Sequence, residues 1–156
     1  MSHESHAALN LLLERATQER DRLAGELRRG EEVLQRARVQ GEQLVSYRAE
    51  YLQRWNTQFG RGGAIEIVHC YQSFMQRLDE ATEQQQRHID AAEAGVAAVR
   101  TALVQAEVRV ASVKKLIERR QAEQRRAHER RDQRQTDETA QQITLRRSRQ
   151  GLAVQH

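Results

Sequence analysis

The sequence predicts an all-α protein, a long antiparallel two-helix coiled-coil hairpin with a helical C-terminal overhang. Three observations predict it: the chain has no proline, apolar residues repeat in heptads over two segments of equal length, and glycines cluster between these segments. Of the 156 residues 31% are charged, and Gln, Arg, Glu and Ala dominate, as in long solvated helices. Disordered chains are also polar, but they lack such a period. We therefore expect one coiled-coil domain over residues 1–156.

The first helix is expected at about residues 6–58. Alternating steps of four and three residues from Leu9 meet apolar or small side chains at every position except Arg20 and Arg48, which is a heptad pattern. These positions form the first seam: Leu9, Leu13, Ala16, Arg20, Leu23, Leu27, Gly30, Leu34, Ala37, Gly41, Leu44, Arg48, Tyr51 and Trp55. Gly30, Ala37 and Gly41 make it thin at its centre, where two helices could approach closely.

A turn is expected at residues 59–65. Gly60, Gly62 and Gly63 fall within four residues there, and such a cluster ends a helix and gives the backbone the freedom that a turn needs.

The second helix is expected at about residues 66–145. The same stepping from Tyr71 gives the second seam: Tyr71, Met75, Leu78, Thr82, Gln85, Ile89, Ala92, Val96, Val99, Leu103, Ala106, Val110, Val113 and Ile117. Only Thr82 and Gln85 break it. The two seams are equally long, roughly 70 Å at 1.5 Å per residue, so each could cover the other in a hairpin. Pairing of each helix with a second copy is the alternative, but the glycine cluster and the matched arms favour the hairpin.

Beyond Ile117 the apolar stripe ends, although good helix formers continue. We expect this part to extend the second helix as a polar overhang without a partner in the chain, and residues 146–156 to fray.

The basic excess of the chain lies in this overhang. The chain has 26 basic and 22 acidic residues, of which ten and six follow residue 117. Arginine clusters raise the possibility of nucleic-acid binding. However, acids alternate with these arginines and can pair with them one turn away. A solvated mixed-charge helix, or one that docks in a polar protein cavity, is therefore the favoured interpretation, with no nucleic acid as a partner.

The sequence contains no constellation typical of an enzyme, so we expect no catalysis, no metal and no cofactor. His69 and Cys70 are adjacent and would point about 100° apart on a helix, which makes a poor nucleophile–base pair. His3 and His6 could share a helical face, but two ligands fall short of a metal site. The single cysteine, the lack of a membrane-length apolar run and the lack of a leader pattern suit a soluble cytoplasmic protein.

The aromatic residues are unevenly distributed. All six lie between positions 47 and 74: Tyr47, Tyr51, Trp55, Phe59, Tyr71 and Phe74. For Tyr51, Trp55 and Tyr71 we favour packing between the helices near the turn. Tyr47 and Phe74 are expected to be exposed, as part of a docking surface.

Three segments with these residues carry a family resemblance. The first segment, before the turn, is VQGEQLVSYRAEYLQRW, and it contains an L-x-x-Y-x-x-x-Y pattern at Leu44, Tyr47 and Tyr51. The second segment follows the turn and reads YQSFMQRLDEATEQ. The third segment, RRDQRQTDETAQ, carries Asp137 and Glu138 in a basic helix. In order and spacing they resemble the FliJ family of flagellar type III export proteins. The similarity extends over nearly the whole chain.

The resemblance implies a stalk-like coiled coil of the flagellar type III export apparatus, with roles in flagellum biogenesis, protein transport, motility and chemotaxis. The implied partners are the hexameric export ATPase, the cytoplasmic domain of the export-gate protein FlhA, and export chaperones. The implied location is the cytoplasm at the flagellar base, peripheral to the inner membrane.

The resemblance also implies two sets of site residues. Carried over by position, the gate-binding residues are Gln40, Leu44, Tyr47, Tyr51, Phe74, Leu78, Ala81 and Gln85, the last standing where the family pattern has histidine. The ATPase-binding residues are Arg130, Arg131, Arg134, Asp137 and Glu138. A generic coiled-coil scaffold and the equivalent stalk protein of a virulence injectisome are the alternative functions, although the YRAEY stretch fits the flagellar branch better.

Overall fold

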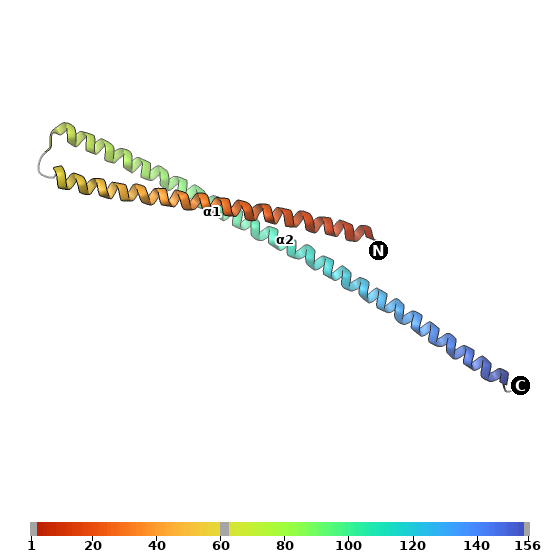
Figure 1. Cartoon of the computed structure of the whole chain (residues 1–156). Helices are drawn as coiled ribbons and strands as arrows, with labels where there is room; N and C mark the ends of the chain where they lie inside the picture. The colour runs from red at the N-terminus through yellow and green to blue at the C-terminus, as the bar shows by residue number, and fades with distance from the viewer. Residues whose placement is uncertain (1–2, 60–62, 155–156) are drawn as a thin grey trace. The chain divides into compact units, whose positions relative to one another are not determined.

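Two helices make up almost the entire described chain. The computed structural model describes residues 3–59 and 63–154, with α1 at His3–Phe59 and α2 at Ile65–Val154 (Figure 1). Within these ranges only Gly63 and Ala64 are outside a helix, and there is no strand, so the all-α prediction is confirmed. Residues 60–62 of the predicted turn lie outside the described residues. With no proline to remove a backbone donor, both helices continue without interruption.

The chain divides into two units. One falls within Met1–Glu14 and Val110–His156, and the other is Arg15–Arg109. The prediction of one domain over the whole chain stays a prediction.

In the unit Arg15–Arg109, the two helices lie side by side and run in opposite directions (Figure 1). Three ion pairs join them: Glu31 to Arg100 at 3.0 Å, Arg38 to Glu93 at 3.0 Å and Arg48 to Asp79 at 2.6 Å. As the residue number rises along α1, the partner's number falls along α2, which is an antiparallel register. The side chains of all three pairs are substantially exposed, so the pairs contribute little to stability. Their main value is that they define this register.

The core is the predicted seam. Every position of both seams is buried or half-buried, and the ten buried apolar side chains found among the described residues all belong to the seams. These ten are Leu9, Ala16, Leu23, Leu34, Met75, Leu78, Ile89, Val96, Ala106 and Val110. In the unit Arg15–Arg109, Leu34, Ile89 and Val96 form a cluster of buried residues, with Leu27, Ala37 and Ala92 packed against it. The hydrophobic core is shallow, because two paired helices bury only one stripe of side chains on each helix.

The polar residues that interrupt the seams have local partners. Arg48 reaches Asp79 across the pair, and the Thr82 hydroxyl donates to the Leu78 carbonyl oxygen at 2.9 Å. The Gln85 carboxamide nitrogen donates to the Ala37 carbonyl oxygen at 2.8 Å. Within the described residues, no buried side-chain nitrogen or oxygen lacks a hydrogen-bond partner. The interruptions therefore leave no buried polar group unsatisfied, which would be costly.

Two seam glycines let the helices approach closely. A Cβ added at Gly41 would lie 3.1 Å from Cδ1 of Ile89, and one at Gly30 would lie 3.3 Å from Cγ2 of Val96. Both distances are tighter than ordinary van der Waals contact. The thin place predicted from the sequence is thus filled by side chains of α2.

The part of α2 that extends beyond α1 begins later than the sequence predicted, and α2 itself ends later. In the unit that contains both chain ends, Arg120 of α2 donates a hydrogen bond to the Ser5 hydroxyl of α1, and Ala127 is still half-buried. From His128 to Val154 every residue is exposed. α2 continues to Val154, past the predicted end of the second helix at about residue 145, and Gly151 is the one helix breaker in that extension. Fraying from residue 146 stays a prediction.

Candidate protein-binding surfaces

All six aromatic side chains form one continuous group, called here the aromatic cluster. Phe59 contacts Trp55, which stacks on Tyr71 with ring centroids 4.1 Å apart. Tyr71 in turn stacks on Tyr51, and Tyr51 contacts Phe74 at 4.4 Å. Tyr47 completes the cluster through contacts with Tyr51 at 6.4 Å and Phe74 at 6.2 Å. Because the rings come from both helices, the antiparallel register itself assembles this surface.

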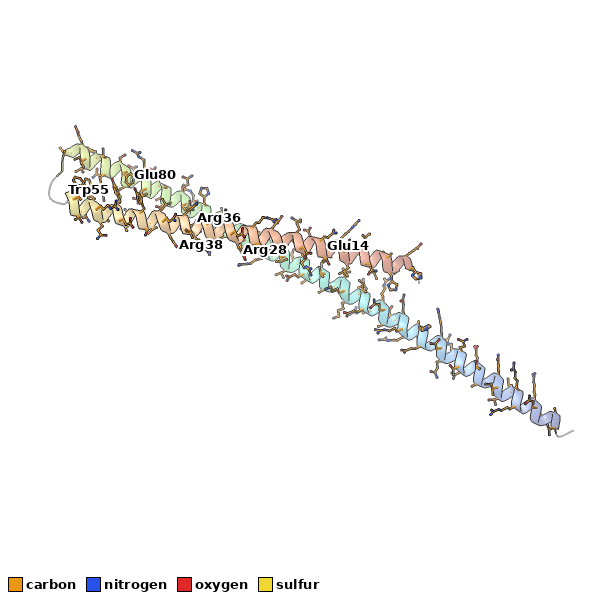
Figure 2. All side chains as sticks on the ribbon, viewed as in Figure 1. Glu14, Arg28, Arg36, Arg38, Trp55 and Glu80 are labelled. Atoms are coloured by element: carbon orange, nitrogen blue, oxygen red, sulfur yellow. The ribbon has the colours of Figure 1, made fainter. Side chains whose placement is uncertain are left out.

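The cluster is neither fully buried nor fully exposed. Tyr47 retains 50% of its accessible surface, as predicted for a docking residue. Tyr51, Trp55 and Tyr71 are half-buried between the helices, in the position predicted for them, and Figure 2 shows Trp55 near the end of α1 that adjoins the connection. Phe74 differs from the prediction: it is half-buried, because its ring packs between Tyr47 and Tyr51.

The other predicted gate residues extend the aromatic cluster along the pair. The Gln85 carboxamide nitrogen also donates to Oε1 of Gln40 at 3.3 Å, which brings these two positions together across the helices. Leu44 and Ala81 are half-buried and Gln40 is exposed. Leu78 is only 7% exposed and belongs to the core. Its side chain can support this surface but offers almost no area to a partner.

A charged pair lies beside the aromatic cluster. Nε of Arg48 donates to Oδ1 of Asp79 at 2.6 Å, and this hydrogen bond raises the pKa of the Arg48 guanidinium above its ordinary value. An arginine guanidinium is charged at any physiological pH, so Arg48 presents a positive charge to the Asp79 carboxylate throughout that range.

Sequence reasoning missed a shallow groove further along the same unit. It has a volume of about 580 Å³, and its apolar or small lining residues are Gly41, Val45, Ala49 and Ile89. Arg38, Glu42 and Gln86 are among its polar lining residues. The signal available in the sequence was the spacing of Val45, Ala49 and Leu52, a short second apolar stripe on α1 beside the seam.

The predicted ATPase-binding residues all lie on the exposed end of α2. Arg130, Arg131, Arg134, Asp137 and Glu138 are exposed, and none of the five is in an ion pair within the described ranges. The predicted pairing of acids with arginines one turn away does not occur in this segment. Within the described part of this segment, Nε2 of His128 lies 3.6 Å from Oδ2 of Asp132, a contact that is an ion pair only when the imidazole is protonated. The charges of this segment therefore face solvent.

A second groove that sequence reasoning missed lies where α1 begins. Its volume is about 380 Å³, and its lining includes Ser5, His6, Arg120, His128 and Arg131. The first residues of α1 thus lie close to one of the predicted ATPase-binding arginines. The signal available in the sequence was that helix-forming residues begin before Leu9. In an antiparallel pair, these residues would meet the polar part of α2 that follows Ile117.

Histidine, cysteine and carboxylate side chains of the described part of the chain are the candidates for a metal site and for the nucleophile–base pair considered from the sequence. No group of three histidine, cysteine, aspartate or glutamate side chains could hold a metal ion there. His69 and Cys70 are both exposed. Neither described helix has a stretch apolar enough to cross a membrane.

Comparison with known proteins gives two findings. The family model described as "Flagellar FliJ protein" matches residues 5–149. Over 82 residues the chain is 42% identical to a flagellar FliJ protein of Salmonella typhi, a stretch that covers 51% of this chain and 54% of the relative. The match thus spans about half the length of that curated relative. No solved structure matches the chain.

Proposed function

Because the chain belongs to the FliJ family of flagellar protein export components, we propose that it couples the export ATPase to the export gate by binding both. The observation that most supports this proposal is the chemical difference between its two exposed surfaces. One is the aromatic cluster, built by both helices, and the other is the charged single helix at 128–154.

The gate would bind the aromatic cluster. Tyr47 supplies the exposed ring, Gln40 supplies an amide at the margin, and Phe74 and Tyr51 hold Tyr47 in place. Aromatic residues packed by their neighbours bury apolar area with little loss of side-chain freedom, which is typical of binding hot spots. The partner would be the cytoplasmic domain of FlhA.

The ATPase ring would bind the exposed end of α2. Arginines without ion pairs are available for carboxylates of a partner, which they contact in a bidentate geometry. Asp137 and Glu138 would contact basic groups of the same partner. The protein would perform no chemistry of its own, ATP hydrolysis being the role of the ring. We further propose that it binds export chaperones and is located in the cytoplasm at the flagellar base, beside the inner membrane.

The ATPase half of the proposal is tested by copurification with the export ATPase of the same organism. The full chain is expected to bind, and a chain that ends at Ala127 is expected to lose binding while it remains helical. Equal binding by both chains would contradict the assignment of this surface.

The gate half is tested by titrating the FlhA cytoplasmic domain with single variants. Tyr47→Ala is expected to weaken binding at least tenfold, about 1.4 kcal/mol. Val45→Ala is the matched control, since Val45 is similarly exposed but lines the groove instead. An unchanged affinity for Tyr47→Ala, or an equal loss in the control, would exclude the aromatic cluster as the specific site.

A further inference from the structure

The groove lined by Gly41, Val45, Ala49 and Ile89 continues into exposed apolar surface along α1. Val45 retains 58% of its accessible surface, Leu52 retains 38%, and Ala49 between them is exposed. These three residues follow one another at steps of four and three, so they share one side of the helix. The four groove residues and Leu52 are called here the lateral strip. From Gly41 to Leu52 the strip is roughly 16 Å long, at 1.5 Å per residue.

Carboxylates lie on both sides of the lateral strip. Glu42 lines the groove from α1, and Gln86 lines it from α2. Glu83 and Asp90 lie one helical turn before and after Gln86, on the same side of α2. The Gln86 carboxamide nitrogen donates to Oδ1 of Asp90 at 3.0 Å, which holds this carboxylate at the margin of the groove.

The negative charge of these carboxylates is not balanced within the strip. Arg38, which lines the groove (Figure 2), is already paired with Glu93, and Arg48 is paired with Asp79. Arg87 points about 100° of rotation away from its neighbour in the lining. The three carboxylates beside the strip are exposed, and they are in no ion pair with any residue of the described ranges. They are therefore available to cations of a partner.

A helix fits the lateral strip better than an extended segment does. An extended segment binds through backbone hydrogen bonds to a sheet edge, whereas both walls of this groove are helices, whose backbone groups are bonded internally. Apolar residues at steps of four and three form the rows into which the side chains of another helix pack. The small residues Gly41 and Ala49 would let that helix approach closely.

A second copy of the chain does not suit the strip. In a symmetric dimer the same patch of each copy meets the other. The carboxylates of one strip would then face those of the other, and juxtaposed like charges oppose association. The charge of the strip instead favours a partner of a different sequence with basic side chains.

We propose that the lateral strip binds an amphipathic helix of another protein, with aliphatic side chains along one side and lysine or arginine along both edges of that side. The aliphatic side chains would pack on Val45, Ala49 and Ile89. The cations would contact the carboxylates of Glu42 and Glu83, one on each side of the strip.

This surface is separate from the aromatic cluster. Val45 and Tyr47 are two residues apart on α1, which corresponds to about 200° of rotation. A helix bound to the lateral strip would therefore leave Tyr47 accessible, and a second partner could bind there at the same time. The inference does not depend on the proposed function, because it uses neither the aromatic cluster nor the exposed end of α2.

Binding of labelled model peptides tests the proposal. The basic peptide is an amphipathic helix of about 18 residues, or five turns, with leucine at every third or fourth position and lysine along both edges of the leucine stripe. Its acidic counterpart has glutamate in place of each lysine. Fluorescence anisotropy with the full chain measures the Kd of both peptides. The basic peptide is expected to bind about tenfold more tightly or better, and added salt should reduce the difference.

Variants of the full chain locate the binding. Val45→Asn is expected to weaken binding of the basic peptide about tenfold, because a polar amide would enter the apolar contact. Val104→Asn is the matched control, since Val104 is 57% exposed and lies on α2 beyond the Glu31–Arg100 pair. It is expected to change binding less than about threefold. Asparagine and valine have similar helix propensities, and circular dichroism checks that both variants stay helical.

Charge reversal gives an independent measurement. Glu42→Lys combined with Glu83→Lys is expected to invert the preference, so that the acidic peptide binds more tightly than the basic one. Loss of helix structure would weaken both peptides and could not produce this inversion. An unchanged preference for the basic peptide would overturn the charge complementarity on which the proposal depends.

The remaining outcomes also decide the matter. No binding of the basic peptide, equal affinity for both peptides, or an equal loss in Val104→Asn would overturn the strip as a specific site. A dimer of the full chain that Val45→Asn dissociates would show that a second copy covers the strip, contrary to the proposal. The gate assignment has its own readout, the Tyr47→Ala titration, so either proposal can fail alone. Displacement of the bound peptide by the FlhA cytoplasmic domain would overturn the separation of the two surfaces.

Discussion

Single small or large side chains decide how closely the two helices pack. A Cβ at Gly41 would meet Ile89, a buried core residue. At Gly95 of α2, by contrast, a Cβ would meet nothing within 4 Å beyond the glycine's own chain neighbours and helix backbone. The same residue type therefore has different functions at these positions. At Gly41 the missing side chain creates space for a neighbour, while at Gly95 it only lowers helix propensity.

Alanine substitution is expected to separate these two roles. Gly95→Ala should raise the free energy of unfolding by about 1 kcal/mol, the propensity gain. Gly41→Ala should give no gain or a net loss, because the new methyl group would press on Ile89 at 3.1 Å. Urea denaturation measures the free energy of unfolding of both variants. An equal increase in each would contradict the close approach of the helices at Gly41.

The predicted gate-binding residues should likewise divide into those that stabilise the helix pair and those that contact the partner. Leu78→Ala is expected to lower the free energy of unfolding by about 2–5 kcal/mol, as for a buried leucine. Tyr47→Ala should cost less than half as much, because its ring is half exposed. Thermal and urea unfolding of the two variants would test this ranking. If Tyr47→Ala proves the more destabilising, Tyr47 is a core residue and not a contact residue.

At the scale of the helix, the heptad pattern predicted the core in full. Every seam position from Leu9 to Trp55 and from Tyr71 to Ile117 is at least half-buried, because a repeat of 3.5 residues determines which side of each helix meets the other. The heptad pattern could not predict contacts that depend on the length and orientation of individual side chains. Phe74 lies deeper than expected because rings of α1 pack around it, and Arg120 reaches Ser5 beyond the last apolar position. The two grooves also depend on the spatial register of both helices.

The paired and the unpaired parts of α2 should differ in stability. Residues 128–154 have no buried side chain. Their helical structure therefore depends on helix propensity and on continuity with the paired part of α2, and a helix without tertiary packing is only marginally stable in water. Hydrogen exchange of backbone amides is expected to be fast in this segment and slow around Ile89 and Val96. Uniform protection along α2 would contradict an unpaired end.

A truncated chain gives the complementary prediction. A chain that ends at Ala127 should unfold at the same urea midpoint as the full chain, since the removed residues make no core contact. A chain that ends at Ile117 should be less stable, because it lacks the contact of Arg120 with Ser5 and the half-buried Ala127. Equal stability of all three chains would place the end of the pairing at Ile117.

For the whole molecule, the central claim is that one chain folds back on itself in an antiparallel register. Pairing between copies would give similar helicity and a similar seam. It would differ in mass, so light scattering is expected to give the monomer value of 18.1 kDa. A dimer mass at micromolar concentration would contradict the fold-back.

Engineered cysteines at positions 30 and 96 test the claim most directly. The Cβ expected at position 30 lies close to the Val96 side chain, so Gly30→Cys and Val96→Cys, in a chain with Cys70→Ser, should be near enough for a disulfide. Mild oxidation is expected to produce a disulfide within one chain, seen as a monomer of altered mobility on a non-reducing gel. Disulfide-linked dimers, or no disulfide at all, would contradict the fold-back and the register on which the aromatic cluster depends.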